Sequence, residues 1–344
     1  MAIVRLRTGL GDLLCTVPAL RALRRRLPRA RIAIVTFAEM GGVVERMRPY
    51  VDELIPFPGV RGIPERPPVE AAFPRFLAQT RARKLDVALQ MYGANAAADA
   101  VTAALGARRI GGFLAHGDPA ITIPYPAGEH EVRRHLLLMR HLGADDGDEA
   151  LAFPVSRADR LTAPAMAPPY ALIHPGATSP SRRWPLERFA AVGDALAARG
   201  LGVGIVGTSG EHRLAHRLAA RMGAPSRVLA GRTSLGALAA LLERAALFVA
   251  NDSGPAHLAA AVGTPSVTVF LSGDPVRWAH DARLHRVARA DVGCNPCPHL
   301  TCPIDHRCAS GVRAEAVIEH ADALLARART IGPCTSSSAG TGST

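Results

Sequence analysis

The sequence is poor in aromatic residues and in lysine. Phe, Trp and Tyr make up 4% of the 344 residues, which argues against a surface that binds nucleic acid by stacking bases on aromatic rings. Lys84 is the only lysine, so arginine supplies nearly all of the positive charge behind the formal net charge of +12. Two interpretations of that charge stay open, an ordinary solvated surface or a basic face that attracts phosphates or an anionic membrane surface.

Long apolar runs are missing as well. No stretch reaches the roughly 18 uncharged apolar residues that a membrane-spanning helix needs. Arg5, Arg7 and Asp12 interrupt the N-terminus where a signal peptide would have its apolar region. We therefore predict a cytoplasmic protein, with peripheral contact at the inner face of the cytoplasmic membrane as an extension of that prediction.

Short β-rich runs alternate with helical patterns along most of the chain, which predicts an α/β protein with mostly parallel sheets. A length of 344 residues favours two domains. We expect strands at residues 3–6, 31–35, 53–55, 85–89, 170–174, 202–206, 247–250 and 266–270. We expect helices at residues 15–27, 69–82, 131–142, 185–199, 211–222, 234–244, 253–262 and 313–329. The predicted division is an N-terminal Rossmann-like lobe (1–153), a linker (154–169), a C-terminal Rossmann-like lobe (170–312), a C-terminal helix (313–331) and a mobile tail (332–344).

The first predicted strand leads into RTGLGD at residues 7–12, a glycine-bearing loop at the start of a helix. Glycines at such a turn let the backbone approach an anion or another polar ligand. Alternatively, Asp12 only caps the helix. A dinucleotide-binding loop would need a third glycine where Leu14 stands and an acidic residue near Thr36, at the end of the second strand. A nicotinamide-dependent oxidoreductase is therefore disfavoured.

Two more polar loops follow predicted strands in the second half. HPGAT at residues 174–178 precedes Arg182, and small residues, hydroxyls and a guanidinium before a helix suit a diphosphate. NDSGPAH at residues 251–257 opens another helix at the carboxyl end of a strand, where open α/β sheets bind ligands. The alternatives are a surface loop with unrelated arginines, a helix cap at Asp252 or Ser253, and an inner His257 without a ligand.

Four segments, in order and with their spacing kept over residues 1–330, resemble glycosyltransferase family 9, the ADP-heptose:lipopolysaccharide heptosyltransferase-like family. They are RLRTGLGDLLCTVPALRALRRRLP, HPGATSPSRRWPLERF, VANDSGPAHLAAAVGTPSVTVF and CNPCPHLTCPIDHRC. The resemblance implies a GT-B fold of two facing Rossmann-like lobes and transfer of a sugar with inversion and without a metal. It implies a nucleotide-diphosphate sugar as donor, ADP-heptose first of all, and a lipopolysaccharide-core or other lipid-linked glycan as acceptor.

The resemblance also implies roles for residues. Asp12 falls on the catalytic base of the family. Donor-side positions are Thr8, Gly9, Thr178, Arg182, Glu211, Asp252, Ser253, Gly254 and His257. Family members commonly carry lysine at the position of Arg182, and arginine keeps the charge while adding a two-pronged donor. The sugar and the acceptor stay open, since members of the family outside this pathway use other donors.

The cysteine-rich segment supports a second, different hypothesis. Cys294, Cys297, Cys302 and Cys308 have a spacing compatible with a structural zinc site, and reduced thiols or a local disulfide are the alternatives. With the net charge of +12, zinc would fit a basic nucleic-acid-binding protein, which the two-lobe α/β pattern disfavours. We predict that this cluster is structural, takes no part in catalysis and lies away from the three strand-end loops.

Overall fold

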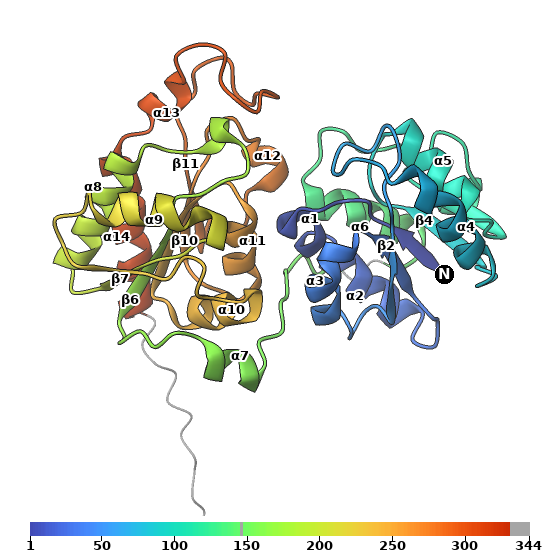
Figure 1. The fold of residues 1–344 in the computed structure, drawn as a ribbon, viewed down its shortest axis with the longest axis horizontal. Coiled ribbons are helices and arrows are strands. Elements are labelled where there is room, and N and C mark those ends of the chain that lie inside the picture. Colours follow the sequence, from blue (N-terminus) through green and yellow to red (C-terminus); the bar gives the residue numbers. More distant parts are fainter. Residues whose placement is uncertain (145–146, 331–344) are drawn as a thin grey trace, which may run out of the picture.

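The structure, a computed structural model, describes residues 1–144 and 147–330. Two lobes lie next to each other, and the chain passes from one to the other near α7 (Arg157–Thr162), which lies below both lobes in Figure 1. The fourteen residues from 331 on lie outside the described part, and so does the tail predicted at 332–344.

The first lobe is built on a five-stranded sheet in the order β3-β2-β1-β4-β5, and all of its strand pairs are parallel. Its strands are β1 (Ala2–Val4), β2 (Ala33–Thr36), β3 (Glu53–Pro56), β4 (Val87–Gln90) and β5 (Arg109–Gly112). Its helices are α1 (Leu10–Leu14), α2 (Val17–Arg26), α3 (Gly41–Arg46), α4 (Phe73–Arg81), α5 (Ala96–Ala104) and α6 (Glu131–His141).

The second lobe repeats this plan with a six-stranded parallel sheet in the order β11-β10-β9-β6-β7-β8. Its strands are β6 (Tyr170–His174), β7 (Gly202–Ile205), β8 (Ser226–Val228), β9 (Leu247–Asn251), β10 (Ser266–Val269) and β11 (His285–Ala288). Its helices are α8 (Leu186–Ala198), α9 (His212–Ala219), α10 (Leu235–Arg244), α11 (Gly254–Ala261), α12 (Pro275–Trp278), α13 (Arg307–Gly311) and α14 (Ala314–Thr330).

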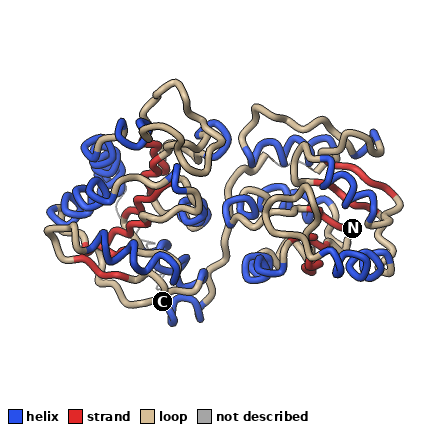
Figure 2. The backbone as a smooth tube through the Cα atoms, turned by 45° about the horizontal axis from the view of Figure 1, so that its top comes forward, coloured by secondary structure: helices blue, strands red, loops and turns tan. Residues whose placement is uncertain are grey.

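Each sheet is covered by helices on both faces (Figure 2), and this explains why the central strands are mainly apolar, with polar residues such as His174 and Asn251 at their ends. Along β6, Ala171 and Ile173 join one apolar core while Tyr170 and Leu172 join the core on the opposite face. Alternate residues of a strand point to opposite faces, so a strand covered on both sides has no position for an unsatisfied polar side chain.

The strand order reverses between β1 and β4 in the first lobe and between β6 and β9 in the second. Ligands of doubly wound sheets bind at such reversals, beyond the carboxyl ends of the strands. The loops that follow β1, β6 and β9 are the three motif-bearing loops of the sequence. The fold therefore places every one of these motifs at a reversal point.

The helix expected at residues 15–27 is α2, which spans Val17–Arg26 with Thr16 as its N-cap and Pro18 in its first turn. The short α1 before it was not predicted as a separate helix. The linker predicted at 154–169 contains α7, which begins with a capping box between Ser156 and Asp159. Within the described residues no helix has both the length and the apolar character needed to cross a membrane.

Candidate active site

The loop after β1 leads into α1, whose first turn carries Asp12. Gly9 is the N-cap residue, and no side chain makes a capping hydrogen bond there. Asp12 is therefore not the helix cap that remained as the alternative interpretation of the sequence. A Cβ atom on Gly9 would overlap with the Asp12 carboxylate, so glycine is required for this side chain to lie against the loop. The Asp12 side chain is 22% exposed, which leaves it within reach of a substrate.

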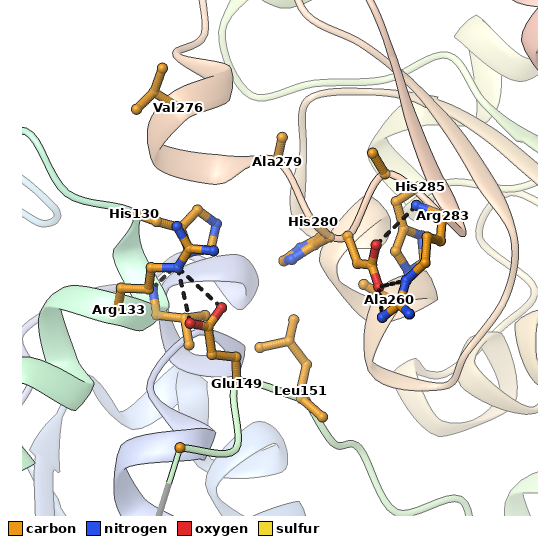
Figure 3. Close-up of a pocket in the computed structure, with 15 residues that line it drawn as sticks. His130, Arg133, Glu149, Leu151, Ala260, Val276, Ala279, His280, Arg283 and His285 are labelled. Carbon is orange, nitrogen blue, oxygen red and sulfur yellow. Dashed lines mark hydrogen bonds and ion pairs between the residues drawn. The ribbon is translucent and has the colours of Figure 1, made fainter. Parts of the chain in front are cut away.

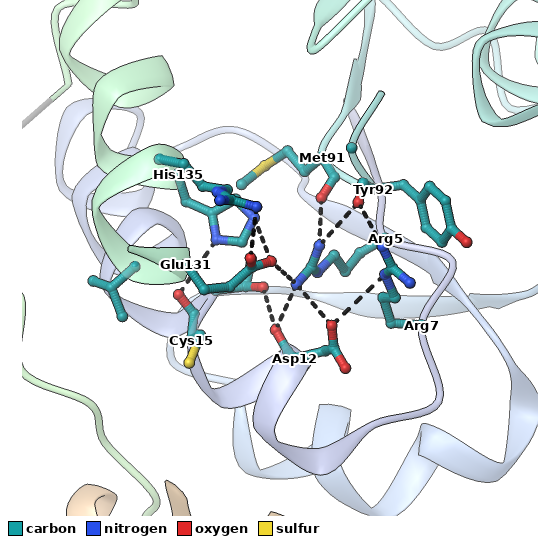
Figure 4. Close-up of polar contacts among 12 residues, drawn as sticks. Arg5, Arg7, Asp12, Cys15, Met91, Tyr92, Glu131 and His135 are labelled. Atoms are coloured by element: carbon teal, nitrogen blue, oxygen red, sulfur yellow. Dashed lines mark hydrogen bonds and ion pairs between the residues drawn. The ribbon is translucent and has the colours of Figure 1, made fainter. Parts of the chain in front are cut away.

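Two arginines hold the Asp12 carboxylate (Figure 4). Arg5 Nη2 lies 3.4 Å from Asp12 Oδ1 and donates to the Asp12 carbonyl oxygen at 3.0 Å, and Arg7 Nε lies 3.6 Å from Oδ1. The Arg7 guanidinium also stacks over the Tyr92 ring at 3.9 Å from its centroid. These contacts fix the direction of the carboxylate.

Glu131, the first residue of α6, is the buried counter-ion of this cluster. Its side chain is 1% exposed, and its Oε1 accepts from Arg5 Nη2 at 2.8 Å. Burial by itself would raise the pKa of Glu131, but the cations around it, first of all Arg5, hold that pKa well below its usual range. Neither Arg5 nor Glu131 was among the site residues predicted from the sequence, although an arginine directly after the apolar strand Ala2–Val4 was a signal.

In the second lobe, Asn251 at the end of β9 joins the loops that the sequence singled out. Its Nδ2 donates to the carbonyl oxygens of Pro175 at 2.8 Å and Gly176 at 3.2 Å, and its Oδ1 accepts from the Trp184 backbone at 3.0 Å. Asn251 is fully buried, so these bonds fix the loop after β6 against the end of β9.

His174 at the end of β6 connects the loops that follow β6, β7 and β9. Its Nδ1 lies 3.3 Å from Ser253 Oγ, and its Nε2 lies 3.3 Å from Glu211 Oε2. Glu211 Oε2 also accepts from the Thr208 backbone at 2.8 Å. Burial would raise the pKa of Glu211, but the contacts with His174 and Thr208 lower it to about 2. The loop of Glu211, which follows β7, thus lies beside the loops that follow β6 and β9.

Asp252 and Arg182 form an ion pair at this place. Arg182 Nη1, from a turn of 3-10 helix at Pro180–Arg182, lies 3.3 Å from Asp252 Oδ2. Asp252 is 3% exposed, and its Oδ2 has no hydrogen-bond partner among the described residues. Burial raises the pKa of Asp252, and Arg182 only partly offsets this. Arg182 is 40% exposed and Thr178 is exposed, so an incoming ligand can reach both.

The two lobes meet where α1 packs against α11 (Figure 1). A Cβ atom on Gly11 would overlap with the His257 ring, and one on Gly254 would lie 3.0 Å from Leu10 Cβ. His257 is 5% exposed, and its Nδ1 lies 2.8 Å from His280 Nε2. The structure thus places Gly254 and His257, expected at the donor, in the contact between the lobes, directly beside the turn of Asp12.

A cavity of about 820 Å³ also lies between the lobes. Its lining includes His130, Arg133 and Glu149 of the first lobe and its linker, and His280 and His285 of the second (Figure 3). It contains none of the site residues predicted from the sequence. Its contact with α11 is at Ala260, near the end of that helix, whereas the predicted donor loops lie at the beginning.

One prediction about the cysteine-rich segment is wrong. The segment does not lie away from the strand-end loops, because Ser181, next to Arg182, donates from its backbone to the Leu300 carbonyl at 2.9 Å and from Oγ to the His299 carbonyl at 2.6 Å. The four cysteines of the cluster are free thiols. Among the residues described, no group of three or more His, Cys, Asp or Glu side chains is arranged to hold a metal ion. The segment supports the loop of Arg182 from outside.

Comparison with known proteins decides the family. A family model described as glycosyltransferase family 9 (heptosyltransferase) matches residues 75–307. The chain belongs to this family. Lipopolysaccharide heptosyltransferase 3 of Escherichia coli is 26% identical over 285 residues, which cover 78% of this chain and 82% of that protein. Lipopolysaccharide heptosyltransferase 1 of Pseudomonas aeruginosa is 29% identical over 188 residues, 52% of this chain and 50% of that protein.

Solved structures confirm the fold of this family 9 chain. The family 9 glycosyltransferase from Veillonella parvula superimposes with a TM-score of 0.76 at 22% identity, over 95% of this chain and 97% of that one. ADP-heptose heptosyltransferase II of E. coli gives 0.73 at 21%, over 95% and 99%. These structures confirm the predicted GT-B arrangement. The family match confirms the glycosyltransferase class, so the nucleic-acid-binding and oxidoreductase alternatives lose their support. Asp12 lies before the matched segment, so its role stays a prediction.

Proposed function

We propose that this family 9 glycosyltransferase moves heptose from ADP-heptose to a lipopolysaccharide-core acceptor, with inversion at the anomeric carbon. Support for the sugar and the acceptor comes from the relatives, which are named lipopolysaccharide heptosyltransferases. One solved neighbour, a heptosyltransferase of E. coli, was determined with ADP-2-deoxy-2-fluoro heptose. A family 9 enzyme that uses another nucleotide sugar and acceptor is the second candidate, because members of the family outside this pathway use other donors.

One structural observation carries the proposal: the turn of Asp12 packs against α11, whose first residues continue the loop of Asp252. A base on one lobe and an anion-binding loop on the other are thereby neighbours. Transfer between two substrates requires this, since holding both reactants in place turns a two-body reaction into an effectively intramolecular one.

In the proposed mechanism, the acceptor hydroxyl attacks the anomeric carbon from the face opposite the diphosphate. A carbon–oxygen bond to the acceptor forms while the bond to the diphosphate oxygen breaks, and ADP leaves with the electron pair. Asp12 takes the hydroxyl proton as general base. Arg182 and the amino end of α11 stabilise the charge that develops on the diphosphate, without a metal.

Further donor contacts in the proposal come from Thr8, Gly9 and Thr178 near the phosphates and from Glu211 near the ribose. A lipid-linked acceptor would bring the enzyme to a membrane surface, and the net charge of +12 supports this part of the proposal.

Replacing Asp12 with Asn tests the assignment of the base. The amide keeps the shape of the side chain but cannot accept the proton, so we expect turnover to fall by about 10²- to 10⁴-fold. Folding and affinity for ADP should stay near those of the wild type. A variant that keeps more than about a third of the wild-type turnover would show that Asp12 is not the base.

A thermal-shift screen against nucleotide sugars tests the donor. The true donor should raise the melting temperature most, because a ligand stabilises the folded state by RT ln(1 + [L]/Kd). A larger shift with a UDP- or GDP-sugar than with ADP-heptose would favour the second candidate.

A further inference from the structure

A chain of ion pairs leads from the second lobe to the candidate base in the first. Arg277 of α12 donates from Nε to Glu131 Oε2 at 2.9 Å. Glu131 Oε1 accepts from Arg5 Nη2 at 2.8 Å, and the same Arg5 nitrogen lies 3.4 Å from Asp12 Oδ1. Arg277 belongs to the second lobe and the other three residues belong to the first (Figures 1 and 4).

The two middle members of the chain are held in place. The side chains of Arg5 and Glu131 are 0% and 1% exposed. Arg5 Nη1 donates to the Met91 carbonyl at 2.7 Å, and Arg134, also 1% exposed, donates to Glu131 Oε2 at 2.9 Å. Charges this far from water interact strongly, so a change at one member is felt by the next.

Arg5 Nη2 is shared among three acceptors. Its contact with Glu131 is the shortest at 2.8 Å, followed by the Asp12 carbonyl at 3.0 Å and the Asp12 carboxylate at 3.4 Å. When Arg277 withdraws, Glu131 loses one of its cations and attracts Arg5 more strongly. Arg5 then holds the Asp12 carboxylate less well.

We infer that Arg277 is a positioning residue: docking of the second lobe brings it onto Glu131, which sets how Arg5 orients the Asp12 carboxylate for reaction. The base is then oriented only when the lobe that carries the donor is in place. Glu131, whose side chain is 1% exposed, is the relay between the two arginines. This inference rests on the proposed role of Asp12.

The chain offers a matched control. Arg46 of α3 forms another ion pair across the lobes, donating from Nη2 to Asp159 Oδ1 at 2.6 Å in α7, which packs on α10 of the second lobe. Among the described residues, no hydrogen bond or ion pair connects that pair to Asp12. Arg46→Ala therefore removes an arginine between the lobes without touching the chain to the base, while Arg277→Ala removes one within it.

The variants Arg277→Ala, Arg277→Lys and Arg46→Ala are compared with the wild type in kcat and in KM for both substrates. We expect Arg277→Ala to lower kcat by about 10- to 100-fold, as misplaced catalytic groups do, with the donor KM changed less than threefold. Arg277→Lys, which restores the charge, should recover most of kcat. Arg46→Ala should lower the melting temperature with kcat within about twofold. An unchanged kcat in Arg277→Ala, or an equal loss in Arg46→Ala, would overturn the inference.

A second measurement does not depend on the sugar. In protein labelled with ¹³C at aspartate carboxyl carbons, with the resonance assigned by its loss in Asp12→Asn, the Asp12 signal should move in Arg277→Ala and stay in place in Arg46→Ala. An unmoved signal in Arg277→Ala contradicts the inference even if the donor is misidentified. Failure of the proposed function looks different: the wild type transfers no heptose, or Asp12→Asn stays active, while the signal still moves.

Discussion

Acid should loosen the contact between the lobes at His257. This side chain is 5% exposed and lies between Gly11 of α1 and His280. Burial, together with His130 and Arg182 and opposed by Glu131, lowers the pKa of His257 to about 4. A protonated ring would have to lose most of its hydration to stay there.

The sign follows from comparing the folded with the unfolded chain. Above pH 6.5 the ring is neutral in both, so it contributes no pH dependence. Between pH 6.5 and about 4 the unfolded chain binds a proton at this ring and the folded chain does not. The free energy of unfolding therefore decreases as the pH is lowered through this range. Integrated over that window the loss is about 3 kcal/mol, since one pH unit corresponds to about 1.4 kcal/mol. Below about pH 4 this contribution stays constant.

Urea unfolding measured from pH 7.5 to 4.5 tests this prediction. Titrating carboxylates and other histidines contribute to the slope of the unfolding free energy against pH, so variants are compared with the wild type. His257→Gln removes the titrating ring and should have a shallower slope between pH 6.5 and 4.5. His116→Gln, at an exposed position, should keep the wild-type slope. If His257→Gln keeps it too, the buried histidine does not cause the acid sensitivity.

Two further predictions concern the donor loop and the lobe contact. Arg182→Ala should weaken ADP binding about 10- to 150-fold in calorimetry, because a charge-assisted hydrogen bond contributes about 1.5–3 kcal/mol, and an unchanged Kd would remove Arg182 from the site. Gly11→Ala should lower kcat and the melting temperature, since its Cβ overlaps with the His257 ring. The matched Gly42→Ala, on α3 with no atom within 4 Å of the new Cβ, should be neutral or stabilise by up to about 1 kcal/mol; equal losses in both would contradict the steric argument.

The central strands could be predicted from the sequence, and the edge strands largely could not. Both ends of Tyr170–His174 were predicted correctly, because a run that is buried on both faces is mainly apolar and loop-forming prolines bound it on both sides. β5, β8 and β11 were missed. All three lie at sheet edges, and each contains an arginine together with glycine, serine or histidine. An edge strand pairs with only one neighbouring strand, so its sequence shows less of the continuous apolar run that marks a central strand.

The loops of the candidate site could be predicted because each follows a strand with a local signature. Their connections could not. Asn251 fixes the loop after β6 through two carbonyl oxygens about 75 residues away in sequence, and Arg277 reaches Glu131 across 146 residues. Contacts between residues this far apart in the sequence cannot be predicted from hydrophobic periodicity or motif spacing. Such pairs depend on how the two sheets are placed relative to each other, and the local pattern of a single sequence does not show this.

The contact between α1 and α11 changes how the glycine motifs are understood. In the sequence, the glycines of GLGD and DSGPAH indicate close approach of a ligand to the backbone. In the structure, the close approach at Gly11 and Gly254 is made by the opposite lobe, through His257 and Leu10. A loss of activity on substituting either glycine would therefore report on the lobe contact before it reports on a ligand. Substitution of Gly11 should therefore lower turnover more than it lowers the affinity of the enzyme for ADP, because only turnover needs the two lobes together.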